Sequence, residues 1–364
     1  MQRENRSSGT GFILKGLSDD PMMDLILFFV FLSIYLVTLV GNSTLIIISK
    51  IDCNLQTPMY FFLSNLSFLD MCYTTSIVPK MLVNFLMTKK TISYAGCAAQ
   101  MYVHLSLGET ECILLAVMAY DRYVAICNPL RYMIIMNTHV CIKIALGTWI
   151  SGFLPSIVHV ASTLLLPLCG DEINHFLCEI PAVMRLSCID TFINEVVIFV
   201  GAVLILLIPV FLIAVTYLHI LMTILKIQSA KGRSKAFSTC ASHLTVLTIF
   251  YGTAIFMYMS PQSNHSPNMD KIVSVLYLIV TPMLNPLIYS LRNKDVKGAL
   301  QKAIVKKLSS DASCPANYRP ISITPFLSNL FNSFISTGST IPSMEESLTV
   351  LIPKPEKDCI QCSS

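Results

Sequence analysis

The chain has 364 residues, of which 54% are hydrophobic and 13% are charged, and its formal net charge is +4. Soluble domains carry about a quarter charged residues, so this composition argues against a soluble enzyme. The small net charge and the placement of basic residues in short loops argue against a nucleic-acid-binding surface.

Long stretches without Asp, Glu, Lys or Arg follow one another along the chain. A bilayer core of about 30 Å needs roughly 20 apolar residues per helix. Five stretches meet this requirement without a charge, one more is interrupted only by Asp70, and another only by Glu109 and Glu111. We therefore predict seven membrane-spanning helices, at 25–49, 53–79, 91–120, 144–170, 196–225, 236–269 and 272–291.

The orientation follows from the basic residues in the loops. Cytoplasmic segments of membrane proteins carry an excess of Lys and Arg. By this rule the N-terminal segment, residues 1–24, is predicted to be extracellular. Two glycosylation sequons, at Asn5 and Asn264, then fall on the outer side. The chain is thus predicted to be a multi-pass glycoprotein of the plasma membrane.

Four motifs carry a family resemblance. They are PMYFFLSNLSFLD at 58–70, MAYDRYVAIC at 118–127, KAFSTCASHL at 235–244 and PMLNPLIYSLR at 282–292. In this order, and on these predicted helices, they resemble the olfactory receptors of the rhodopsin-like G-protein-coupled class, and the overall pattern is similar to the class II, tetrapod-type group. The resemblance covers about residues 1–307.

That resemblance implies an all-α, seven-helix receptor domain over 25–307, including a short cytoplasmic amphipathic helix. It also implies a sensory function in olfaction. A small, mostly hydrophobic odorant would bind between the helices, and the inner face would activate a stimulatory, olfactory-type heterotrimeric G protein that raises cyclic AMP. Such a receptor is a transducer without catalytic residues.

Two acidic residues are predicted at mid-depth of the membrane. Asp70 and Glu111 each incur an insertion cost of at least ~2.5 kcal/mol, so their presence needs a reason. The resemblance implies a sodium site, with the ion acting as an allosteric modulator. The alternative is a neutral, hydrogen-bonded polar cluster that holds the helices together.

The third predicted helix ends in Asp121, Arg122 and Tyr123. Adjacent opposite charges at a membrane boundary can simply anchor a helix in the headgroups. The resemblance instead implies that Asp121 restrains Arg122 at rest and that Arg122 receives the G protein on activation. By the same resemblance, the remaining switch residues are Tyr217, Asn285, Pro286 and Tyr289.

The outer halves of the third, fifth and sixth predicted helices are expected to line the ligand cavity. Steps of three or four residues outward from Arg122 share one helix face. The candidate lining residues are Met101, His104, Leu105, Gly108, Glu109, Gly201, Ala202, Ile205, Tyr251, Ala254, Ile255 and Tyr258. The wall is chiefly apolar, which suits a ligand held by shape and one or two hydrogen bonds.

Two of these residues leave the ligand class open. Glu109 favours an amine, whereas His104 favours an oxygenated odorant or a metal ion bridged by a thiol. The alternative is that Glu109 is protonated or faces a neighbouring helix and that His104 is an interior histidine with its hydrogen bonds satisfied.

Four cysteines lie at the outer side, which is an oxidising compartment, and they permit three pairings. Spacing does not select among them. The resemblance implies disulfides Cys97–Cys178 and Cys169–Cys188, which close the long loop over the cavity.

Residues 308–364 extend beyond the family pattern and are rich in Ser and Pro, which predicts a largely disordered tail. There are three alternatives to a signalling receptor: a transporter, an intramembrane enzyme, and a non-signalling or poorly expressed product. A transporter should show inverted repeats, and an intramembrane enzyme should show a nucleophile motif beside its acids, but the sequence shows neither. A product that is poorly delivered to the cell surface would be identified by comparing surface delivery with and without residues 308–364.

Overall fold

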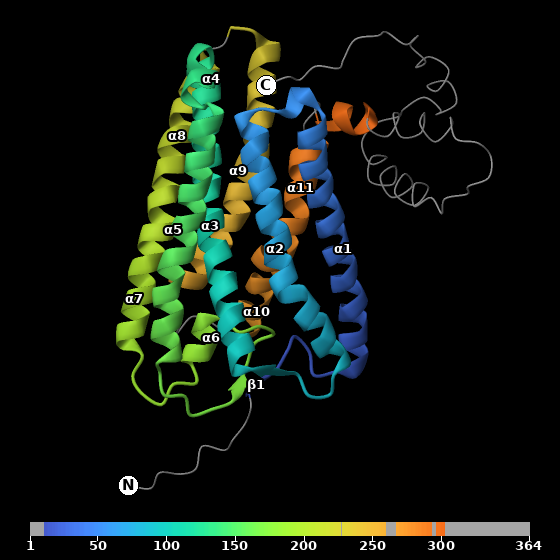
Figure 1. The fold of residues 1–364 in the computed structure, drawn as a ribbon, viewed down its shortest axis with the longest axis vertical. Coiled ribbons are helices and arrows are strands. Elements are labelled where there is room, and N and C mark those ends of the chain that lie inside the picture. Colours follow the sequence, from blue (N-terminus) through green and yellow to red (C-terminus); the bar gives the residue numbers. More distant parts are fainter. Residues whose placement is uncertain (1–10, 227, 260–266, 293–295, 303–364) are drawn as a thin grey trace, which may run out of the picture. The chain divides into compact units, whose positions relative to one another are not determined.

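The computed structural model describes residues 11–226, 228–259, 267–292 and 296–302. The described helices up to Gln301 belong to one compact unit, in which long helices lie side by side (Figure 1). The predicted glycosylation sites Asn5 and Asn264 and the tail 308–364 lie outside the described residues.

The long helices follow the predicted order of apolar stretches. They are α1 (Pro21–Ile51), α2 (Pro58–Leu86), α3 (Tyr94–Cys127), α5 (Thr138–Leu164), α7 (Phe192–Ala202) continuing through η3 (Val203–Leu207) into α8 (Ile208–Leu225), α9 (Ala230–Met259), and α10 (Pro267–Val275) continuing through η5 (Leu276–Val280) into α11 (Thr281–Arg292). Short elements connect them: η1 (Cys53–Leu55), η2 (Pro129–Arg131), α4 (Tyr132–Ile135) and α6 (Ile180–Met184). Residues 296–302 are also helical.

Polar caps fix where several helices begin. The Asp20 carboxylate accepts a hydrogen bond from the Met22 backbone at the start of α1. Ser93 and Asn137 do the same for α3 and α5. These side chains satisfy backbone N–H groups that have no partner in the first turn of a helix.

Prolines explain the two wide turns inside the helical runs. The π-helical segments η3 and η5 are each followed by a proline, Pro209 and Pro282. A proline has no N–H to donate, and its ring clashes with the carbonyl four residues before it, so the preceding turn widens. Pro286 lies further along, inside α11.

The surface of the helices is apolar. Phe211 and Leu218 on α8 are 67% and 60% exposed, and similar side chains project from α1 and α5. Within the described residues, five helical runs are long and apolar enough to cross a membrane: Pro21–Ile51, Tyr94–Cys127, Thr138–Leu164, Phe192–Leu225 and Asn268–Tyr289. Exposed apolar side chains of this kind suit a lipid environment.

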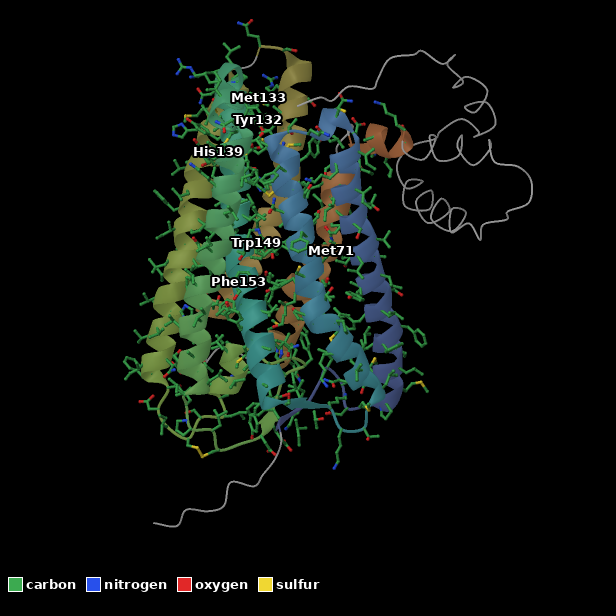
Figure 2. The ribbon with its side chains drawn as sticks, viewed as in Figure 1. Met71, Tyr132, Met133, His139, Trp149 and Phe153 are labelled. Carbon is green, nitrogen blue, oxygen red and sulfur yellow. A yellow bond between two sulfur atoms is a disulfide. The ribbon has the colours of Figure 1, made fainter. Side chains whose placement is uncertain are left out.

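Small residues let neighbouring helices approach closely. A Cβ on Gly152 of α5 would collide with Thr110 and with the Ser106 backbone of α3, so these two helices nearly touch there. On the same helix, the Trp149 indole donates a hydrogen bond to the Asn65 side chain of α2 (3.3 Å), and its ring lies against Phe153 (Figure 2). Helix α5 is therefore held to both α2 and α3.

One end of the bundle carries a three-stranded sheet in the order β2-β1-β3. Strand β1 (Gly11–Leu14) pairs antiparallel with β2 (Thr91–Ser93) and parallel with β3 (Glu172–Ile173). The segment before α1 is thus joined to two loops that are distant in sequence. We call this the sheet end, and the opposite one the α4 end.

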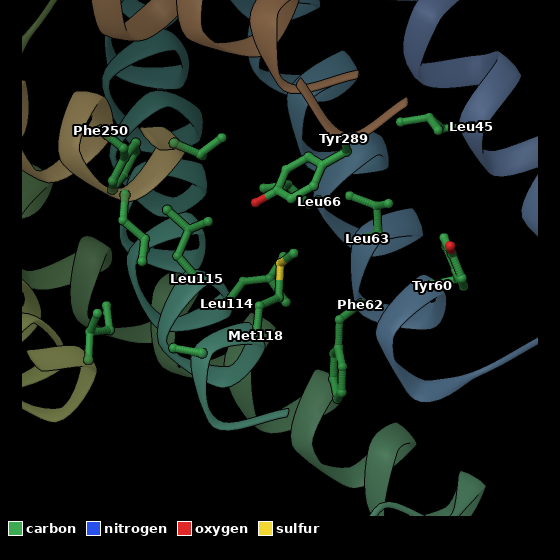
Figure 3. Packing of buried hydrophobic residues seen from close by; sticks show 14 of the residues in the cluster. Leu45, Tyr60, Phe62, Leu63, Leu66, Leu114, Leu115, Met118, Phe250 and Tyr289 are labelled. Atoms are coloured by element: carbon green, nitrogen blue, oxygen red, sulfur yellow. The ribbon is translucent and has the colours of Figure 1, made fainter. Parts of the chain in front are cut away.

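Apolar side chains fill the space between the helices. Towards the α4 end, the Tyr289 ring of α11 lies among Leu66 of α2 and Leu114 and Leu115 of α3 (Figure 3). A second cluster, which includes Tyr73, Ile77 and Tyr277, lies nearer the sheet end. The two clusters position the residues of the candidate site.

A largely buried ion pair ties the first turn of α1 to the loop between α2 and β2. Lys90 Nζ donates to Asp24 Oδ2 (2.6 Å) and to the Ser18 carbonyl (2.9 Å). The two charged side chains are only 13% and 9% exposed. Each charge therefore depends on the other for compensation.

Replacing Lys90 with methionine is expected to lower the free energy of unfolding by about 3 kcal/mol, because it leaves the Asp24 carboxylate buried without its partner. Thermal unfolding in detergent measures the change. Lys89→Met is the matched control, since Lys89 is exposed. Equal unfolding temperatures for the two variants would contradict the prediction, and adding Asp24→Asn to Lys90→Met should recover part of the loss.

Candidate functional site

A cavity is lined by residues of α2, α3, α5, α6, α7, η3, α9 and η5. Its volume is about 70 Å³. Most of its wall is formed by apolar side chains, including Leu105, Ile205 and Phe250. Such a cavity suits a small hydrophobic molecule with few polar groups.

The structure brings most of the sequence-predicted ligand residues together around this cavity. Those that line it are His104, Leu105, Gly108, Glu109, Gly201, Ala202, Ile205, Ala254 and Tyr258.

Three predicted ligand residues lie elsewhere. Met101 is fully buried in the cluster beneath the loop that Cys97 and Cys178 anchor. The Tyr251 hydroxyl donates to the Cys112 carbonyl (2.6 Å), so this side chain joins α9 to α3. Ile255 packs against the Tyr289 cluster.

Sequence reasoning missed several lining residues: Tyr73, Cys112, His159, Ile180, Ile198, Leu206, Phe250 and Tyr277. A signal was present for two of them. Tyr73 lies one turn from Asp70, and Tyr277 lies about two turns from Asn285, so each shares a helix face with a residue of the predicted polar cluster. His159 is on a helix from which no ligand residue was predicted.

His104 is held between two tyrosines. Its ring stacks on Tyr73 at 5.5 Å between centroids, and its Nε2 lies 3.4 Å from the Tyr277 hydroxyl. The side chain is only 3% exposed. The histidine therefore has an interior partner, although it also borders the cavity.

The loop after α5 covers the cavity at the sheet end. Both disulfides that the resemblance implied are present, Cys97–Cys178 and Cys169–Cys188. The backbone N–H of Cys178 also donates to the Gln100 side chain (2.9 Å). Ile180, two residues beyond Cys178, lines the cavity, so the disulfide places the loop directly over it.

Two titratable side chains are buried in this covering loop. His175 Nε2 and Glu179 Oε1 lie 3.3 Å apart but are not aligned for a hydrogen bond. Burial is the main cause that lowers the pKa of His175 to about 3. Burial, followed by the nearby Asp270 carboxylate, raises the pKa of Glu179 to about 8. Both groups are therefore mainly uncharged at neutral pH.

A polar cluster lies deeper between α1, α2, α3 and α11. The Asn285 amide donates to both carboxylate oxygens of Asp70 (3.2 and 3.0 Å), and the Asn42 amide donates to the Pro282 carbonyl (3.2 Å). Both Glu111 oxygens and the amide oxygens of Asn42 and Asn285 are buried without a hydrogen-bond partner. Among the described residues, no group of three or more His, Cys, Asp or Glu side chains is arranged to hold a metal ion.

The fit of a cation to this cluster rests on oxygen atoms. Asp70 is close enough to Glu111 for each charge to act on the other. Carboxylate and amide oxygens are the donors that hard cations prefer, and buried oxygens without partners suggest a missing positive group. The donor set therefore suits an ion such as sodium.

Part of the predicted switch lies at the α4 end, whereas Asn285 belongs to the polar cluster. Tyr217 of α8 and His243 of α9 are hydrogen-bonded (2.6 Å), and the His243 ring lies 6.4 Å from the Tyr289 ring. The Arg122 charge acts on all three side chains. His243 was missing from the predicted set, although it belongs to the KAFSTCASHL motif.

Asp121 has a hydrogen-bond partner that was not predicted. Its carboxylate accepts a hydrogen bond from the Tyr132 hydroxyl of α4 (2.9 Å), while the neighbouring Arg122 charge lies close by. Tyr123 packs its ring against His219 of α8 (6.0 Å). The three-residue motif thus contacts both α4 and α8.

Comparisons with known proteins identify a family. The family model of the olfactory receptors matches residues 31–307. Olfactory receptor 2G3 of Homo sapiens is 53% identical over 305 residues, which cover 84% of this chain and 99% of that receptor. Olfactory receptor 2K2 of Homo sapiens is 53% identical over 306 residues, covering 84% and 97%. Olfactory receptor 13C2 of Homo sapiens is 52% identical over 317 residues, covering 85% and 100%.

Proposed function

This chain belongs to the olfactory receptor family, and from that premise we propose that it binds small, mostly hydrophobic odorants and activates a stimulatory, olfactory-type G protein, raising cyclic AMP. The main support for a hydrophobic ligand is the apolar cavity beneath the disulfide-anchored loop. Burial of apolar ligand surface against Leu105, Ile205 and Phe250 supplies most of the affinity.

The proposed receptor spans the plasma membrane seven times with its N-terminus outside. Support comes from the exposed apolar side chains on the helices and from the two disulfides, which form in an oxidising compartment. In this orientation the sheet end is extracellular, and the α4 end faces the cytoplasm. The helix at 296–302 would then be the cytoplasmic helix expected from the sequence.

Signalling is proposed to proceed through a two-state helix bundle. An odorant that binds one arrangement of the helices more tightly shifts the population towards it. At the cytoplasmic end, Arg122 lies among Tyr217, His243 and Tyr289, which come from three other helical segments. A shift of α9 would change the Tyr217–His243 hydrogen bond and expose Arg122 to the G protein. Pro286 in α11, beside Asn285, provides a flexible point between the polar cluster and this region.

A sodium ion is proposed as a modulator of that equilibrium. Asp70 and Glu111 would hold it, with the amide oxygens of Asn42 and Asn285 close by. The support is the set of buried oxygens that have no hydrogen-bond partner. A cation would neutralise part of the buried negative charge and so stabilise whichever arrangement keeps the cluster compact.

The test is to express the full chain with the olfactory-type G protein and to record cyclic AMP across a chemically mixed odorant panel. Surface labelling in the same cells shows whether the receptor is delivered. A concentration-dependent rise that requires both the receptor and the G protein is expected. Silence across the panel from a well-delivered receptor would count against the proposed function.

A further inference from the structure

The cavity has one acidic corner. Glu109 of α3 and His159 of α5 both line it, and their closest side-chain atoms, Oε1 and Nε2, lie 4.0 Å apart. At that distance the two side chains are neighbours without a hydrogen bond between them. Glu109 is 6% exposed, so its carboxyl group is enclosed by protein and by the cavity.

Each of these side chains has an atom without a partner. The Glu109 Oε2 atom and the His159 Nδ1 atom are buried and make no hydrogen bond, while Ser156 lies within reach of the Glu109 carboxyl. A buried carboxyl oxygen without a donor costs free energy that a ligand donor can recover. No Lys or Arg lines the cavity among the described residues, so the wall offers no permanent positive charge to this acid.

The position of His159 depends on a glycine. A Cβ added to Gly201 of α7 would lie 2.5 Å from the His159 Cε1 atom and 2.6 Å from Nε2. Real Cβ atoms do not approach so closely, and the imidazole would have to move. Gly201 therefore leaves the space in which the imidazole reaches towards Glu109.

We propose that Glu109 and His159 form the recognition point for a small aliphatic amine, and this inference rests on the proposed function. The ammonium group would donate to Glu109 Oε2 and place its positive charge beside the carboxyl. The alkyl chain would lie against Leu105, Ile205 and Ala254. The amine supplies both the donor and the charge that this corner lacks.

Other ligand classes fit the corner less well. An aldehyde, ketone or ester brings only acceptors and would leave Glu109 Oε2 without a donor. A neutral alcohol supplies one donor but no charge. A thiol bridged by a metal ion needs several metal ligands, and the described residues contain no group of three or more candidates.

The first experiment compares ligands of equal chain length on the unaltered receptor. Full-length protein in lipid nanodiscs is titrated with hexylamine, 1-hexanol, hexanal and hexyltrimethylammonium, and the rise in unfolding temperature reports binding. Hexylamine is expected to bind at least about tenfold more tightly than 1-hexanol, because hydrogen bonds to a charged group contribute more than neutral ones. The quaternary ion, which lacks an N–H, should bind more weakly than hexylamine. Equal affinities for hexylamine and 1-hexanol would overturn the proposal.

The second experiment substitutes Glu109 and Gly201. Glu109→Gln keeps the size of the side chain and removes its charge, and it is expected to weaken hexylamine binding by about tenfold or more while changing 1-hexanol binding little. Gly201→Ala should also weaken hexylamine selectively by displacing His159. The control is Glu195→Gln, which removes an exposed carboxylate of α7 that is bonded to Thr191. Unchanged hexylamine affinity in Glu109→Gln would overturn the assignment.

The binding readout separates this inference from the proposed function. If hexylamine binds through Glu109 but no ligand raises cyclic AMP, the binding site stands and the signalling function fails. If other odorants raise cyclic AMP while hexylamine neither binds nor signals, the receptor function stands and the amine assignment fails.

Discussion

Cells that express the Arg122→Ala variant are expected to show no odorant-evoked rise in cyclic AMP, although the variant still binds odorant and reaches the surface. Arg122 is half-buried near the α4 end of α3, where its charge acts on Tyr217, His243 and Tyr289. Alanine removes the group that is proposed to meet the G protein. Because Arg122 does not line the cavity, ligand affinity should change less than about threefold, a free-energy difference below ~0.7 kcal/mol.

The measurement pairs cyclic AMP with binding in nanodiscs and surface labelling. Arg131→Ala is the matched control, because Arg131 is an exposed arginine in the neighbouring segment η2. It should keep most of the response. A response from Arg122→Ala that equals the response from Arg131→Ala would show that the Arg122 charge is not required for coupling.

Replacing Cys97 with serine is expected to produce the largest loss of stability. Cys97 and Cys178 are fully buried and are separated by 81 residues. Closing a loop of that length stabilises the folded state by roughly 4–5 kcal/mol in the chain-entropy model. The variant also leaves a hydroxyl and a thiol fully buried in an apolar cluster, and it releases the loop that covers the cavity.

The matched comparison uses a second disulfide and a free thiol. Cys188→Ser opens a bridge with a separation of 19 residues, for which the same model gives about 3 kcal/mol. Cys72→Ser alters a cysteine outside both disulfides. The losses of unfolding temperature and of surface delivery should be largest for Cys97→Ser, smaller for Cys188→Ser and smallest for Cys72→Ser. Wild-type stability for Cys97→Ser would refute the structural role assigned to the bridge.

The sequence located the helices better than their ends. The apolar stretch at 91–120 stops before Asp121, but α3 continues to Cys127. A charge ends a hydrophobic stretch, whereas a helix ends only where its backbone geometry changes. The last helical run likewise begins at Pro267, before the charged residues Asp270 and Lys271 at which the predicted stretch stops. Asp270 is paired with Arg185 of the covering loop (2.8 Å).

Candidate ligand residues were predictable where helical phase was known. Leu105 and Gly108 follow from the face of α3 that Arg122 defines, and both line the cavity. Helical phase does not show which other segment packs on a helix face. Met101 shares the face of Leu105 and Gly108, but it is covered by the loop after α5. His159 could not be placed, because no motif fixes the rotation of α5 and because its position depends on the absence of a side chain at Gly201.

The three-stranded sheet at the sheet end sets an order of assembly. Strand β1 leaves the ribosome first, yet it lies between two strands that are synthesised later. At ~5–20 residues per second, the partner of Ile13 in β3, Glu172, follows it by roughly 8–30 s. During that interval α1, α2 and α3 are already being inserted while β1 has at most one neighbour. The sheet end of the receptor therefore closes late in biogenesis, and a chain that stalls before Glu172 keeps an open strand edge that chaperones can recognise.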